Sequence, residues 1–192
     1  MSFVKVCWKG IYNPCAAFEA LRDQSRPTYG LLAVSTRFVL TSLTTILALR
    51  ELGVRPFAPP SLTFLNAADY YSAELWFLPV FGLAVWQLMS AIAGSLLSLS
   101  GQQVSFAKML NLIGIGMLIP MPAVWAWDWA VIALGLYNVH VMAVSHLLFQ
   151  LWETCLQTVG LRVLFGTKLW VAAAIALLAN SAYVLLAMLI VR

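Results

Sequence analysis

Long apolar runs separated by short polar stretches dominate the chain, and their length predicts membrane-spanning helices. A helix needs about 20 apolar residues to cross a hydrocarbon core of about 30 Å. The runs are apolar on all sides rather than alternating, which favours helices over the strands of a membrane barrel. We predict five spans, at approximately residues 31–49, 75–99, 104–125, 130–149 and 169–191.

Residues 1–30 are more polar, and we predict a cytoplasmic segment containing a short amphipathic helix. Asn13-Pro14 is a typical helix start, because Asn caps free backbone N–H groups and Pro suits the first helical position. Within residues 16–24, Phe18 and Leu21 share one face and charged residues occupy the rest. Such a helix is expected to lie on the bilayer surface. A second surface helix is predicted at residues 150–167.

Two features of the third span predict how it bends and ends. Pro120 and Pro122 are expected to kink it, because proline removes a backbone donor. Asp128 stands between Trp127 and Trp129. Since tryptophan gathers at membrane–water interfaces, this stretch predicts a short surface turn between the third and fourth spans.

The composition agrees with an integral membrane protein and excludes a soluble enzyme. Of 192 residues, 62% are hydrophobic and 9% are charged, and the mean hydropathy is +0.90. Soluble domains average roughly 45–50% apolar and about 25% charged. The expected organisation is therefore the segment 1–30 followed by a transmembrane domain, 31–192.

The sequence carries no recognisable catalytic or metal-binding motif. Its three cysteines form no C-x-x-C pair, and phosphate-loop, H-E-x-x-H and G-x-S-x-G patterns are absent. His140 and His146 are six residues apart and face different directions on a helix. We therefore predict a non-enzymatic protein with no metal and no cofactor. The chain has no basic stripe with interleaved aromatic residues, so we do not expect nucleic acid as a partner.

Basic residues predict the orientation in the membrane. With the N-terminus inside, the outer side holds three basic residues, Arg50, Arg55 and Arg192. The inner side then holds seven, Lys5, Lys9, Arg22, Arg26, Lys108, Arg162 and Lys168. Since cytoplasmic loops are enriched in Lys and Arg, we predict a cytoplasmic N-terminus and an external C-terminus.

Arg37 is the most informative single residue, because a charge within a span is costly. It lies about 10 Å along the axis from Leu31 at a rise of 1.5 Å per residue. One interpretation is that its stem reaches the inner headgroups. The other is that it pairs inside the bundle, with Asn111 or His140 as neighbours, or binds an anion there.

Other polar residues within the spans allow two interpretations. One is a polar lining near mid-membrane, formed by Arg37, Gln87, Asn111, Asn138, His140 and Asn180. The other is hydrogen bonding and close packing between helices. Small residues at four-residue spacing form a ridge on which another helix can pack closely, and they are compatible with a homo-oligomer; they are Ser90, Gly94 and Ser98. Pro120 is interpreted in the same way, as a structural kink.

Several soft motifs resemble the Yip family (Ypt/Rab-interacting membrane proteins), in its bacterial form. Asn13-Pro14 and Phe18 before a short charged helix are similar to the family's N-terminal segment. The stretch from Gly101 to Pro120 resembles its third span, and that from Trp152 to Leu178 its last hairpin. The Asp-Leu-Tyr-Gly-Pro motif of eukaryotic members is absent. The resemblance implies five spans, a cytosolic N-terminus and, for a bacterial member, the inner membrane.

Two functions remain open from the sequence. The leading hypothesis is a non-enzymatic protein that organises the membrane, with the lipid bilayer and a protein at the cytoplasmic face as partners. The alternative is a small transporter or channel that uses the polar lining.

Overall fold

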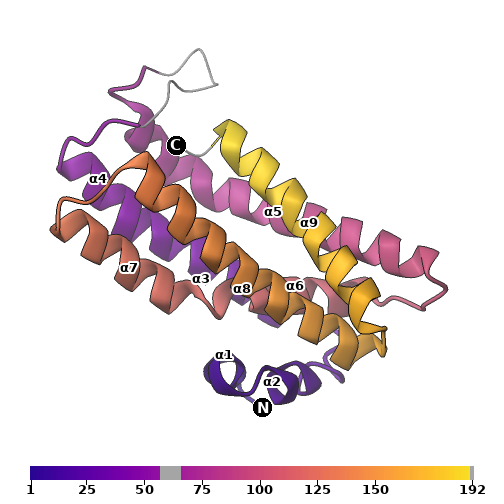
Figure 1. Cartoon of the computed structure of the whole chain (residues 1–192). Coiled ribbons are helices and arrows are strands. Elements are labelled where there is room, and N and C mark those ends of the chain that lie inside the picture. The colour runs from indigo at the N-terminus through magenta and orange to yellow at the C-terminus, as the bar shows by residue number, and fades with distance from the viewer. Residues whose placement is uncertain (57–65, 191–192) are drawn as a thin grey trace.

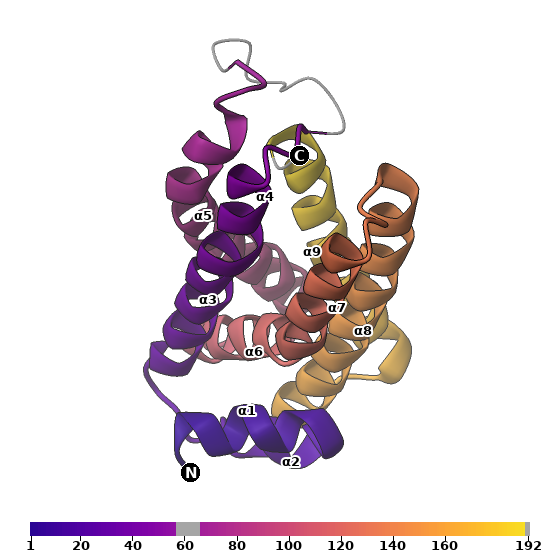
Figure 2. The same cartoon turned by 90° about the vertical axis from the view of Figure 1, so that its left-hand side faces the viewer.

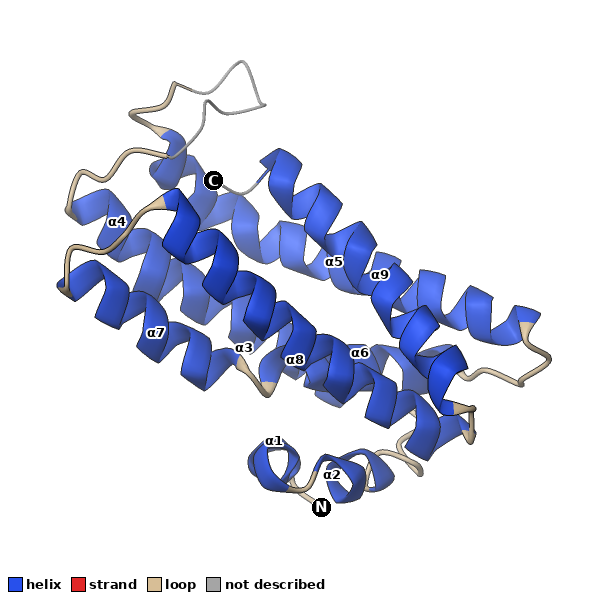
Figure 3. Ribbon diagram, viewed as in Figure 1, coloured by secondary structure: helices blue, strands red, loops and turns tan. Residues whose placement is uncertain are grey.

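Helices account for every regular element of residues 1–56 and 66–190, the part of the chain that this computed structural model describes (Figure 3). They pack into a bundle whose long helices run roughly along one axis (Figure 1). The elements are α1 Phe3–Tyr12, α2 Pro14–Glu19, α3 Thr28–Thr41, the π-helix η1 Ser42–Ile46, α4 Leu47–Glu51, α5 Tyr70–Leu99, α6 Phe106–Leu118, α7 Met121–Ala133, α8 Val139–Phe165 and α9 Leu169–Ile190.

Four helical segments are long and apolar enough to cross a membrane, which confirms the predicted helical membrane class. They are Thr28–Glu51, Tyr70–Leu99, Phe106–Ala133 and Leu169–Leu189. The spans predicted at 31–49 and 75–99 fall inside the first two. The span predicted at 169–191 matches α9, except that residue 191 lies outside the described residues.

The boundary predicted between the third and fourth spans is wrong. Asp128 does not lie in a surface turn but inside α7, where its side chain is buried. The chain instead turns at residues 134–138, where Gly135 has a φ of 66° and Asn138 caps α8. The third segment therefore runs from Phe106 to Ala133, with the expected break at Pro120 between α6 and α7.

The predicted surface helix at 150–167 is also wrong, because these residues continue α8 without interruption to Phe165. The helix ends at Gly166, which adopts the left-handed conformation that glycine tolerates best. Figure 1 shows α8 running back along the bundle beside α9. Its sequence is more polar than that of the four segments above, because one face of α8 is lined with buried polar side chains.

Glycines set the closest helix crossing in the bundle, between α3 and α6. A Cβ at Gly114 would lie 2.6 Å from the Cα of Gly30, and a Cβ at Gly30 would lie 2.3 Å from the carbonyl oxygen of Leu110. The expected ridge on α5 is looser. Ser90 and Gly94 are buried, whereas Ser98 is exposed, and a Cβ at Gly94 would meet only Val104, at 3.8 Å.

The N-terminal helices α1 and α2 lie crosswise to the bundle, at the end where α3 begins (Figure 2). The predicted start of α2 is confirmed, since the side chain of Asn13 accepts a hydrogen bond from the Ala16 amide at 3.0 Å. The helix is shorter than the predicted 16–24, since it ends at Glu19, and the predicted position on the bilayer surface is wrong for its apolar face, because Phe18 and the following Leu21 are fully buried in the protein. Phe18 packs beside Gly160 of α8. Helix α1 was not among the elements predicted from the sequence.

Candidate functional site

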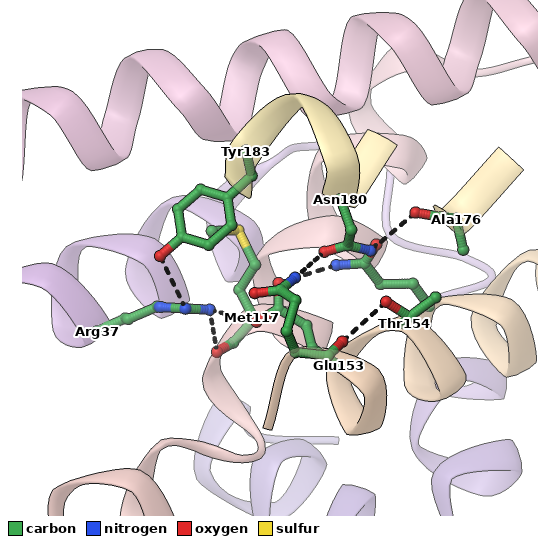
Figure 4. Close-up of polar contacts among 9 residues, drawn as sticks. Arg37, Met117, Glu153, Thr154, Ala176, Asn180 and Tyr183 are labelled. Atoms are coloured by element: carbon green, nitrogen blue, oxygen red, sulfur yellow. Dashed lines mark hydrogen bonds and ion pairs between the residues drawn. The ribbon is translucent and has the colours of Figure 1, made fainter. Parts of the chain in front are cut away.

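A buried ion pair joins α3 to α8 in the interior of the bundle. Arg37 is only 8% exposed, and its Nη1 lies 2.7 Å from Oε2 of Glu153 (Figure 4). The same nitrogen donates to the carbonyl oxygen of Met117 at 2.8 Å. Arg37 therefore does not extend to the headgroups, and of the two interpretations the pairing inside the bundle holds, although with a different partner than expected.

The break between α6 and α7 supplies the Met117 carbonyl. α6 ends at Leu118, and the last turn of a helix leaves carbonyl groups without helical donors. Pro120 and Pro122 lack the amides that would bond to the carbonyls of Gly116 and Leu118, on either side of Met117. The guanidinium of Arg37 thus bonds to a carbonyl in the last turn of α6, next to the break that the prolines produce. This gives the proline break a specific structural role.

Tyr183 of α9 completes the surroundings of Arg37. Nη2 of Arg37 lies 3.5 Å from the Tyr183 hydroxyl. The guanidinium also lies 5.6 Å from the centroid of the Tyr183 ring and 5.4 Å from that of Phe38. A cation within about 6 Å of an aromatic face is stabilised by the ring quadrupole. Three helices therefore hold this one charge.

Neutral side chains extend the ion pair into a continuous network. Gln157 donates to Oε1 of Glu153 at 3.2 Å, and Asn180 donates to the side-chain oxygen of Gln157 at 2.8 Å. Gln150 in turn donates to the side-chain oxygen of Asn180. The network links α8 to α9 and pairs each charge and amide with another group of the protein, as a water-free interior requires.

The predicted polar lining does not converge at one place. Arg37 and Asn180 belong to the network, but Asn111 lies elsewhere. Its side chain accepts from the Gly30 amide and donates to the carbonyl of Arg26, both at 2.8 Å. The other three are exposed, so the expected convergence of the set is wrong; they are Gln87, Asn138 and His140.

Sequence reasoning missed three members of the network, because it assigned them to a surface helix. They are Gln150, Glu153 and Gln157, which are spaced three and four residues apart. Residues at this spacing share one helix face. A polar stripe on a helix that carries leucines on its other faces was the signal that could have identified them.

A second group of buried polar side chains lies toward the end of the bundle opposite to α1 and α2. Asp128 accepts from the Thr45 hydroxyl at 3.4 Å and lies 3.6 Å from Nε2 of His146. Glu74 is fully buried, and neither of its carboxylate oxygens has a hydrogen-bond partner among the described residues. Across those residues, no three His, Cys, Asp or Glu side chains are placed to hold a metal ion.

The outward surface of α1 combines exposed apolar and aromatic side chains with a lysine. Val4, Trp8, Ile11 and Tyr12 are exposed on it, with Lys5 beside them. The opposite face packs on the bundle through Val6 and Gly10. Burial raises the pKa of the neighbouring Cys7 thiol to about 11.

Nothing matches this chain in comparisons with protein-family models, curated proteins and solved structures. The features of the described structure that bear on function are the network around Arg37, the carboxyl group of Glu74 and the surface of α1.

Proposed function

We propose that this chain is a non-enzymatic membrane protein of the Yip type, which organises the membrane or binds a partner at the end that carries α1 and α2. The observation that supports this best is the self-contained bonding of the network from Arg37 to Gln150. A network that satisfies its own groups holds helices together and leaves little for a solute. Helix α1, at the end of the bundle, instead presents exposed aromatic and basic side chains to its surroundings.

In this proposal α8 is the fifth membrane crossing. Its 27 residues extend about 40 Å at 1.5 Å per residue, enough to span the hydrocarbon core. Its polar stripe faces the interior. An exposed apolar stripe at helical spacing is suited to lipid, and it consists of Val144, Leu147, Leu148 and Leu151.

Charge supports an orientation with α1 and α2 at the cytoplasmic face. The seven basic residues assigned to the inner side lie on α1, on the segment around α2 and at the adjoining ends of α6, α8 and α9. Arg50 and Arg55 lie toward the opposite end. Positively charged ends are retained on the cytoplasmic side during insertion.

Photo-crosslinking in intact cells tests the proposal. A photoreactive residue replaces Lys9 on α1 and, as a matched control, Arg50 at the opposite end. We expect reproducible protein or lipid adducts from position 9 and none of the same kind from position 50. Equal adduct patterns at both positions would contradict a functional surface on α1.

One observation favours the alternative of a small transporter, namely the unpartnered carboxyl group of Glu74. Buried ionisable residues in membrane proteins often mark ion or proton pathways. Flux of protons, cations and anions into proteoliposomes distinguishes the two functions. The control is Gln87→Ala, because the side chain of Gln87 is exposed. Flux that is lost in Glu74→Gln but retained in this control would show that the protein is a transporter and would contradict the proposed function.

A further inference from the structure

Helix α1 has two apolar faces, although it packs on the bundle with only one of them. Val6 and Gly10 are buried, and a Cβ at Gly10 would lie 2.3 Å from Cδ1 of Ile119. The second apolar face carries two aromatic residues. Val4 is 72% exposed and Trp8 is 67% exposed. Apolar side chains would be unfavourable on this second face if it contacted only water.

The angular arrangement around α1 separates its three surfaces. Successive helical residues turn by about 100°. Val4, Trp8, Ile11 and Tyr12 therefore fall within a sector of roughly 100°, and Val6 and Gly10 lie on the far side. Lys5 and Lys9 lie between the two apolar sectors, and α1 contains no acidic residue.

The position of α1 places the outer face beside membrane-spanning helices. Its buried face meets Ile119, which lies at the break between α6 and α7. Figures 1 and 2 show α1 at the edge of the bundle, crosswise to the helix axes. A helix so placed lies across the basic end of the bundle, against the membrane-spanning helices, instead of projecting away from them.

We propose that the outer face of α1 is seated in the headgroup layer of the surrounding bilayer and selects anionic phospholipid. Its apolar side chains enter the acyl boundary, with Trp8 and Tyr12 at headgroup level, where such rings are favoured. Lys5 and Lys9 then lie next to lipid phosphates. This inference rests on the proposed membrane location and names lipid as the partner of α1.

Charge complementarity supports an anionic lipid rather than a neutral one. Lys5 is exposed, Lys9 is partly exposed, and Arg26 beyond α2 is also exposed. Basic residues next to a membrane attract anionic headgroups, and each contributes separately. The acidic side chain of Glu19 is paired with Arg22, at 3.7 Å.

Spin labels on the full-length protein in nanodiscs test the depth of α1. With the native cysteines replaced by serine, a label is placed singly at positions 4, 8, 11 and 12, and at 5 and 9 for comparison. We expect the first four to be relaxed more by oxygen and the lysine positions more by a water-soluble nickel chelate. Nickel access at all six positions, or exclusion of both reagents at position 8 by a second protein, would overturn the proposal.

Lipid selection is measured on the same protein. In nanodiscs with equal phosphatidylglycerol and phosphatidylcholine, we expect the protein to retain phosphatidylglycerol. Lys5→Gln and Lys9→Gln should each lower that preference roughly fivefold. Arg50→Gln with Arg55→Gln, at the opposite end, should leave it unchanged. An unchanged preference in the lysine variants would refute anionic selection, and the crosslinking experiment would still test partner binding separately.

Discussion

Replacing Glu153 with glutamine would leave the Arg37 guanidinium inside the bundle without its counter-charge. The substitution keeps the shape of the side chain and removes the 2.7 Å ion pair. Arg37 would retain the Met117 carbonyl and the Tyr183 hydroxyl, which are dipoles rather than charges. The variant therefore isolates the electrostatic part of the contact.

Breaking a buried ion pair by removing one partner costs about 3–5 kcal/mol. For a chain of this length, that predicts a lowering of the melting temperature by roughly 6–20 °C. Arg37→Met should cost less, because a buried carboxylate can be neutralised by a proton, whereas a guanidinium cannot. The double variant Arg37→Met/Glu153→Gln should be more stable than Glu153→Gln alone.

The assay is unfolding in mixed micelles, titrated with a denaturing detergent and followed by circular dichroism, for the four members of this double-mutant cycle. Gln150→Leu serves as the control, because it removes one uncharged hydrogen bond of the same network, and single hydrogen bonds between membrane helices average about 0.6 kcal/mol. A Glu153→Gln variant no less stable than the control would refute the assignment of Arg37 and Glu153 as a stabilising pair. A double variant less stable than either single variant would do the same.

Three further predictions concern packing, capping and thiol chemistry. Gly114→Val should destabilise the protein by about 1–3 kcal/mol through overpacking, measured in the same titration, whereas Gly94→Ala, whose Cβ would meet only Val104 at an ordinary contact distance of 3.8 Å, should not. Asn111→Leu should cost about 1–3 kcal/mol, because it leaves the amide of Gly30 buried and unpaired. At pH 8, about one Cys7 side chain in a thousand should be a thiolate, so its alkylation should accelerate roughly tenfold per pH unit up to about pH 11. Peptide mass spectrometry can compare this rate with that of the exposed Cys15. A rate of Cys7 alkylation that does not change with pH would contradict its burial.

Local sequence signals predicted the features that depend on a single turn of chain. Asn13 starts α2 as expected, and Pro120 breaks the third segment as expected. The apolar runs predicted a helical membrane protein because their length must match the bilayer. The turn at residues 134–138 was missed because Trp127, Asp128 and Trp129 give a stronger interfacial signal than Gly135 and Asn138.

The sequence by itself determined that the charge of Arg37 needed compensation, either at the headgroups or by a partner inside the bundle, since a charge within a span is costly. Only the tertiary structure decided that the partner is Glu153, which lies 116 residues away on another helix. Pairing at that distance depends on the rotation of α3 and α8 about their axes and on the tight crossing of α3 with α6. Those rotations are set by side-chain packing across the whole bundle, and no local pattern encodes them.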